Sequence, residues 1–128
     1  MSLARATGVF IGTDESTGVT IANNASSTGS EVTMLADDTS AGMMNLFLVF
    51  TGAGTTGTLD IYLNQRRVTG QSYEGPNPTI SVKPISGTAK YPIGTFPVSR
   101  YMNARILNNG TGGNVTNVTL GYEIFKAS

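Results

Sequence analysis

The fold is indicated most clearly by nine residues near the C-terminus, Ser99-Arg-Tyr-Met-Asn-Ala-Arg-Ile-Leu107. Met102, Ala104 and Ile106 alternate there with mostly polar neighbours. The same alternation of apolar and polar side chains recurs in residues 58–64 and 114–125. A period of two residues is typical of an antiparallel strand that buries one face and exposes the other to solvent. These three segments are therefore predicted to be half-buried β-strands.

Further segments rich in β-branched and aromatic residues lie between clusters of Gly, Asn, Ser and Thr, which is the usual strand-and-turn pattern. The predicted strands are residues 8–12, 18–22, 31–35, 43–50, 58–64, 79–82, 99–107 and 114–125. No window repeats its apolar residues at helical spacing. We therefore expect an all-β protein: a single antiparallel β-sandwich or jelly roll of about eight strands over residues 1–128. Residues 1–30, which contain few large apolar side chains, are expected to form an arm or an edge hairpin.

One predicted strand differs from the others because it is apolar on both faces. Residues 46–50 read Leu-Phe-Leu-Val-Phe, so Leu46, Leu48 and Phe50 share one face while Phe47 and Val49 share the other. A strand at the surface of a sandwich buries only one face in the core. The pattern therefore predicts a central strand, or a strand whose outer face contacts a partner.

The connections are also informative. Residues 108–114, Asn-Asn-Gly-Thr-Gly-Gly-Asn, tolerate positive φ, so we expect a hairpin between the last two strands. All five prolines lie between Pro76 and Pro97. Because proline cannot donate a ladder hydrogen bond, this window is predicted to be an edge strand or an extended surface loop.

Composition excludes several classes of function. The chain has no His, Cys or Trp, which removes histidine acid–base chemistry, thiol nucleophiles, disulfides and most zinc sites. Charged residues make up only 12% of the chain, with eight of each sign, which argues against the basic patch that nucleic acids require. The longest apolar run, residues 46–50, is far shorter than the ~20 residues of a membrane helix. The first residues show no secretory signal.

The glycine-rich stretch Gly52-Ala-Gly-Thr-Thr-Gly57 matches the dinucleotide-binding pattern GxGxxG. That pattern binds a pyrophosphate only when a helix begins at its end. Here residues 58–63, Thr-Leu-Asp-Ile-Tyr-Leu, alternate with a period of two and predict a strand instead. We therefore expect a hairpin loop and no nucleotide cofactor.

The carboxylates do not form a convincing reaction site. Asp60 and Glu123 lie on polar strand faces and could meet across a sheet, but nothing around them provides the apolar pocket that raises a catalytic pKa. The segment Asp37-Asp-Thr-Ser40 is expected to be a solvated turn, since a calcium loop needs six to eight oxygen ligands. The chain is therefore predicted to be neither an enzyme nor a metal-binding protein.

The best candidate for a binding surface is the irregular stretch of residues 64–78 together with the irregular stretch that follows residue 82. Long loops in compact domains are often functional, and Arg and Tyr are enriched at interface hot spots. The alternative is an ordinary solvated loop. If the stretch is a binding surface, Arg66→Ala with Arg67→Ala should leave the fold intact and weaken binding to the partner. The predicted partner-binding residues are Arg66, Arg67, Tyr73, Lys90, Tyr91 and Phe96.

Residues 98–125 also carry a family resemblance. They combine a Ser-Arg-Tyr opening, an Ala-Arg-Ile strand, an Asn/Gly turn and a Val-Thr return strand. This arrangement resembles the closing hairpin of small jelly-roll proteins from tailed-phage particles. The whole chain has 18 Thr, 16 Gly and 10 Asn but neither Cys nor His, and in this it resembles capsid decoration (cement) proteins.

The resemblance implies a non-enzymatic virion protein on the capsid exterior. It would bind the major capsid protein and form a homo-oligomer, most simply a trimer at three-fold positions, without contacting nucleic acid or membrane. The same Ser-Arg-Tyr opening resembles the last strands of discoidin-like carbohydrate-binding modules. In those modules the aromatic and acidic binding positions lie in loops that have no match here. Because of the shared opening, a carbohydrate- or receptor-binding module is the alternative function.

The rejection of a nucleotide site can be tested by thermal denaturation. A ligand present at a hundred times its dissociation constant stabilises a protein by about 2.7 kcal/mol. We expect millimolar NAD or ATP to leave the melting temperature unchanged. A reproducible rise in melting temperature with either nucleotide would contradict the assignment of residues 52–57 to a simple loop.

Overall fold

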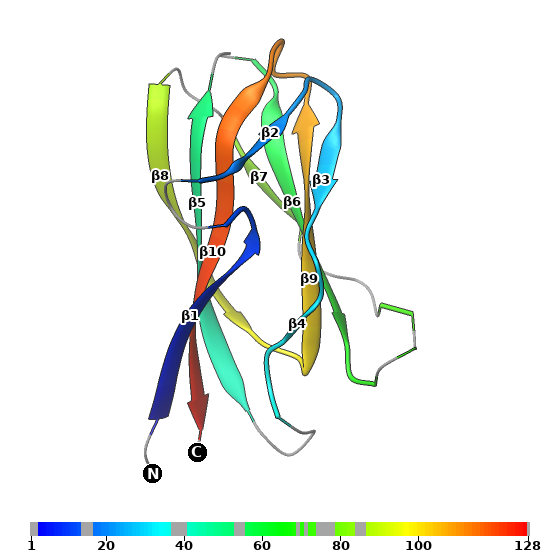
Figure 1. Ribbon diagram of the computed structural model, residues 1–128, viewed down its shortest axis with the longest axis vertical. Helices are drawn as coiled ribbons and strands as arrows, with labels where there is room; N and C mark the ends of the chain where they lie inside the picture. Colours follow the sequence, from blue (N-terminus) through cyan, green and yellow to red (C-terminus); the bar gives the residue numbers. More distant parts are fainter. Residues whose placement is uncertain are drawn as a thin grey trace.

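The computed structural model describes residues 3–13, 17–36, 41–52, 56–68, 70, 72–73, 79–83 and 87–127. Ten strands account for most of these residues, and no helix occurs among them (Figure 1). The strands are β1 (Leu3–Ile11), β2 (Val19–Ile21), β3 (Ser26–Thr28), β4 (Val32–Thr33), β5 (Gly42–Gly52), β6 (Thr58–Arg66), β7 (Thr79–Val82), β8 (Gly87–Pro97), β9 (Tyr101–Asn109) and β10 (Val115–Ala127).

The strands form two antiparallel sheets. The first sheet has the order β1-β10-β5-β8, and β2 also pairs with β10. The second has the order β3-β9-β6-β7, and β4 also pairs with β9. The two chain ends lie together at one end of the molecule (Figure 1), because Leu3 pairs with Ala127.

The strand order is that of a jelly roll. β1 and β2 occupy one edge of the first sheet in succession, and β3 and β4 do the same in the second sheet. Counted as single positions, these edges leave eight strand positions in the orders 1-8-3-6 and 2-7-4-5. Such an order arises when a long hairpin of strands folds over on itself into two Greek keys. The predicted all-β sandwich is confirmed.

The core lies between the sheets and follows the alternation seen in the sequence. Leu59, Ile61 and Leu63 of β6 are fully buried or nearly so, as are Met102, Ala104 and Ile106 of β9. The first sheet contributes Met44, Leu46, Leu48, Phe50, Val118, Leu120 and Ile124. Each of the larger side chains (Val, Leu, Ile, Phe and Met) contributes roughly 1.5–3 kcal/mol to stability when fully buried, so these two facing surfaces hold the sandwich together.

The strand that is apolar on both faces, β5, is central in its sheet, as predicted, and lies between β10 and β8. Its outer face is covered in part by cross-strand packing. Phe47 lies opposite Gly121, where a Cβ atom would come within 2.5 Å of the Phe47 ring. Glycine at this position therefore makes room for the ring to lie across the sheet. Val49, on the same face, is 7% exposed.

Two connections predicted as hairpins cross between the sheets instead. β9 belongs to the second sheet and β10 to the first, so residues 110–114 bridge the sandwich. The glycine-rich stretch at residues 52–57 likewise follows β5 in one sheet and precedes β6 in the other, although its residues 53–55 lie outside the described ranges. Turn-forming residues mark where the chain reverses, but they do not encode which sheet receives the next strand.

The strand prediction also missed two elements. β8 was predicted as an irregular stretch, yet it pairs with β5 over its whole length and forms an edge of the first sheet. An edge tolerates Pro92 and Pro97, which agrees with the edge-strand reading of the proline-rich window. β3, with three residues, was also missed. Within the first thirty residues, β1 and β2 lie along β10 while β3 lies along β9.

The connection from β9 to β10 is held by buried asparagine chemistry. The Asn108 side chain is fully buried, and its amide donates to the carbonyl oxygens of Ile21 and Gly113, both at 2.9 Å. Thr111 donates its hydroxyl proton to Asn108 Oδ1. The turn at Asn24 is fastened to the same loop, since Asn24 Oδ1 accepts from the Gly110 amide at 3.1 Å. Asn108 thus joins the two crossing segments at this end of the sandwich.

This role predicts a stability effect. Asn108→Ala removes the donors to two carbonyls and the acceptor for Thr111, and a buried polar group left without a partner costs about 1–3 kcal/mol. We expect the free energy of unfolding in urea to fall by that amount. Asn64→Ala, on the half-exposed outer face of β6, is the control and should change it by less than about 0.5 kcal/mol. Equal effects of the two substitutions would contradict this assignment.

Candidate binding surface

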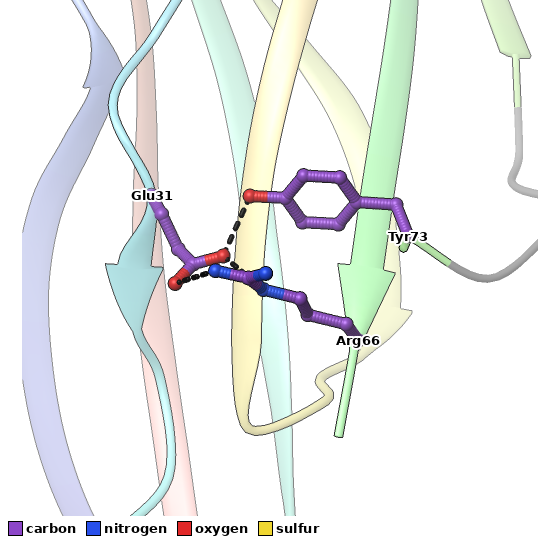
Figure 2. A network of polar contacts seen from close by, with 3 residues as sticks. All are labelled: Glu31, Arg66 and Tyr73. Carbon is purple, nitrogen blue, oxygen red and sulfur yellow. Dashed lines mark hydrogen bonds and ion pairs between the residues drawn. The ribbon is translucent and has the colours of Figure 1, made fainter. Parts of the chain in front are cut away.

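Two of the six residues predicted to bind a partner instead contact Glu31 of the same chain, at a partly exposed ion pair. Arg66, the last residue of β6, donates from Nε to Glu31 Oε2 at 2.6 Å and from Nη2 to Glu31 Oε1 at 2.8 Å. Tyr73 donates its hydroxyl proton to Glu31 Oε2, also at 2.6 Å. The Arg66 guanidinium lies 5.1 Å from the centre of the Tyr73 ring. Figure 2 shows the three side chains converging from three separate segments.

The charges in this cluster stabilise one another. The hydrogen bond from Arg66, followed by that from Tyr73, lowers the pKa of Glu31 below its ordinary value of 4.5. The same bond to Glu31 raises the pKa of Arg66. Burial, and then the hydrogen bond to Glu31, raises the pKa of Tyr73. All three groups therefore keep their usual protonation states at neutral pH, which is the state that a structural ion pair needs.

The cluster fastens the loop after β6 to the opposite edge of the sheet. Arg66 pairs with Tyr101 of β9, while Glu31 immediately precedes β4 on the other side of β9. The ion pair therefore crosses over β9, and Tyr73 holds the following loop to it (Figure 2). Glu31 was not predicted as a member, because 35 residues separate it from Arg66 and no local pattern connects the two.

The remaining predicted residues do not join this cluster. Arg67 is exposed beside it, next to Val68, which is 48% exposed. Lys90, Tyr91 and Phe96 lie in β8 of the first sheet. Tyr91 and Phe96 pack against the core, and the Tyr91 ring stacks on Phe50 with centroids 5.7 Å apart. The six residues therefore do not form one continuous binding site.

Asp60 is a structural group on the outer face of the second sheet. It is 7% exposed and accepts hydrogen bonds from Thr58 and Ser81, each at 2.7 Å, and from Asn109 at 2.9 Å. Burial by itself raises the pKa of Asp60, but the three hydrogen bonds outweigh burial and lower it overall. Glu123 lies in the other sheet, so the acid pair considered from the sequence does not form.

The outer face of the first sheet has a shallow depression of about 560 Å³, lined by Thr7, Phe47, Lys90, Pro92 and Glu123. The Lys90 ammonium lies 5.4 Å from the centre of the Phe47 ring. Nearby on the same face, Met43 is 43% exposed. Aromatic, apolar and charged side chains are thus combined at an accessible surface. The two-faced strand in the sequence was the signal that pointed to it.

The structure describes only part of the residues that were considered as metal-binding candidates. Residues 37–40, which were considered as a calcium loop, lie outside the described residues. Across the described part of the chain, no group of three or more acidic side chains is placed to hold a metal ion. A search of the same residues for a helix long and apolar enough to cross a membrane finds none.

Comparison with known proteins gives no family assignment. No family model matches the chain, and neither the curated proteins nor the solved structures contain a significant match. What the protein does must therefore be argued from its own residues.

The Glu31 ion pair predicts a specific pH dependence. A carboxylate whose pKa is lowered on folding stabilises the fold above its ordinary pKa, and that contribution is lost as the pH falls through the lowered value. Glu31→Gln should therefore be less stable than wild type at pH 7, and the difference should shrink steadily below pH 4.5. Urea denaturation across this range measures it.

Arg66→Ala should behave like Glu31→Gln, whereas Arg67→Ala, at an exposed position, should stay close to wild type at every pH. The two arginines are therefore expected to differ in their effect on stability, because Arg66 holds the ion pair to Glu31 and Arg67 is exposed. A difference between wild type and Glu31→Gln that persists unchanged at pH 2 would show that the ion pair is not its cause.

Proposed function

We propose that the protein is a non-enzymatic structural component of a tailed-phage virion, which decorates the capsid exterior by binding the major capsid protein. Two lines of argument support this function. The closing strands, residues 98–125, resemble those of small phage jelly-roll proteins. Jelly rolls are also a common architecture of viral capsid and lectin domains, which bind other molecules through their surfaces. Fold alone does not determine function, so the state of the polar side chains matters.

The observation that carries the proposal is that the polar clusters of the described residues hold strands together. Glu31, Arg66 and Tyr73 satisfy one another across β9. Asp60 joins β6, β7 and β9 through three neutral donors. Asn108 joins the segments that cross between the sheets. Groups committed in this way stabilise a scaffold, whereas catalysis requires a reactive group poised in a cleft.

The protein surface suits adhesion to another protein. One sheet face is apolar enough to gain from burial, with Met43 and Phe47 on it. The net charge of zero and the abundance of Thr, Ser and Asn avoid the cost of burying unpaired ions at an interface. A decoration protein needs only these properties: a stable fold and a surface that matches the shell.

The second candidate is a carbohydrate- or receptor-binding module. The depression at Phe47 favours it, because an aromatic ring flanked by a hydroxyl, an ammonium and a carboxylate can stack on a sugar and bind its hydroxyl groups. The position of Lys90 over the ring counts against it, since a sugar would have to displace the ammonium.

Capsid binding can be tested directly with purified protein and particles that lack it. We expect saturable co-sedimentation of the protein with such capsids. Arg67→Ala, at the exposed position beside the Glu31 cluster, should weaken binding several-fold, because arginine is enriched at interface hot spots. Arg105→Ala, which removes the same charge from the middle of β9, is the matched control.

Absence of co-sedimentation at micromolar protein would contradict the decoration function. If the protein instead bound a defined sugar on a glycan array, and Phe47→Ala abolished that binding, the second candidate would replace the first. Unchanged capsid binding by Arg67→Ala would remove that residue from the interface without affecting the class of function.

A further inference from the structure

Three residues on the outer face of the first sheet have a symmetric arrangement. Phe47 lies on β5, with Glu123 on the neighbouring β10 and Lys90 on β8. Glu123 is opposite Asn45, two residues before Phe47, and Lys90 is opposite Val49, two residues after it. With strands about 4.8 Å apart and about 3.3 Å per residue, each charged position lies about 8 Å from Phe47, in opposite directions.

We propose that this face binds the same face of a second copy of the chain about a two-fold axis. The two-fold axis lies in the plane of the interface, next to Phe47, and is perpendicular to the line from Lys90 to Glu123. Rotation about this axis places Lys90 of each copy against Glu123 of the other. Each Lys90 ammonium, which lies 5.4 Å from the centre of its own Phe47 ring, turns to the partner's Glu123, and the two Phe47 rings then meet at the centre. A patch that complements itself in this way is the requirement for an isologous dimer.

The apolar surface available on this face supports the pairing. Met43 is 43% exposed. It pairs with Phe125 of β10 and with Pro97 of β8. Along β5 it lies four residues before Phe47, on the side of Phe47 where Glu123 lies. The face spans four strands of 9 to 13 residues, about 30–43 Å long, or roughly 600–800 Å² in projection. Standard interfaces bury about 800 Å² per partner, so the face is large enough once side-chain relief is included.

The other sheet offers no comparable surface among its described residues. Its outer face carries the Asp60 hydrogen bonds, the Glu31 ion pair and Arg105, whose guanidinium lies 4.2 Å from the centre of the Tyr62 ring. These groups are mostly polar or charged, and burying them would gain little.

A second copy fits the face better than the other occupants considered. Charges of both signs placed symmetrically about an aromatic ring match their own rotated image, whereas a trimer would bring two different patches together. The trimer implied by the resemblance would therefore have to use another surface. This inference does not depend on the capsid proposal, because it concerns only how the chain associates with itself.

The test is a charge exchange between two variants. Lys90→Glu places like charges against each other in a homodimer, and so does Glu123→Lys, so each variant should associate at least ten-fold more weakly than wild type. When the two variants are mixed, every introduced glutamate faces an introduced lysine, and every native Lys90 faces a native Glu123. The mixture should therefore form a heterodimer that neither variant forms alone.

This mixing experiment distinguishes contacts between copies from contacts within one copy. Lys90 and Glu123 both also interact within the chain, but an intramolecular contact cannot be restored by a second molecule. Association is measured by light scattering and sedimentation equilibrium, and circular dichroism checks that each variant is folded. Arg105→Glu, a charge reversal on the opposite face of the sandwich, is the matched control and should remain dimeric.

The expected wild-type mass in the micromolar range is that of two chains. A wild-type monomer at 100 µM would overturn the proposal, and so would a stable mass of three chains. Failure of the folded variants to associate in the mixture would also overturn it. Capsid binding by a monomeric wild type would retain the proposed function while removing this interface.

Discussion

The packing of the inner faces of β5 and β10 against those of β6 and β9 is the interaction on which the rest of the structure depends. The side chains involved, including Leu48, Leu120, Ile61 and Ile106, are completely buried. Because each strand presents alternate residues to the core, their partners on the outer faces are fixed at the same time. A shift of one residue in any of these strands would exchange core and surface, so register is strongly determined.

Polar side chains stabilise the parts of the fold that lie outside the apolar core between the two sheets. Asn108 secures the end where the chain crosses between sheets, and the Glu31–Arg66–Tyr73 cluster secures the loop after β6. Asp60 binds three strands of the second sheet together. Each of these networks satisfies its members internally, which is the condition under which buried or half-buried polar groups add to stability.

The functional proposals rest on the difference between the outer faces of the two sheets. The outer face of the second sheet carries mainly polar side chains, whereas the outer face of the first sheet combines Phe47, Met43 and Phe125 with charges of both signs. The two proposals use different parts of the surface: self-association through this face, and capsid binding supported by the exposed loop at Arg67. A structural virion protein requires both a partner contact and a stable assembly, and the two can be tested independently.

The sequence by itself determined the class of fold and the side chains of the core. Alternation in residues 58–64, 99–107 and 114–125 specified which residues are buried, because the pleat of a strand is a local property of the backbone. The two apolar faces of residues 46–50 indicated a central strand or a partner contact, and the missing N–H of proline limited the proline-rich window to an edge strand or a surface loop. Only the tertiary structure decided which strands lie in which sheet, since the turns after β5 and β9 look like hairpins but bridge the sandwich. The tertiary structure also separated the binding candidates. Arg66 and Tyr73 contact Glu31 at the second sheet. The other three candidates in β8, Lys90, Tyr91 and Phe96, lie in the first sheet. Contacts between residues tens of positions apart depend on how the sheets stack, and no local pattern of residues records that.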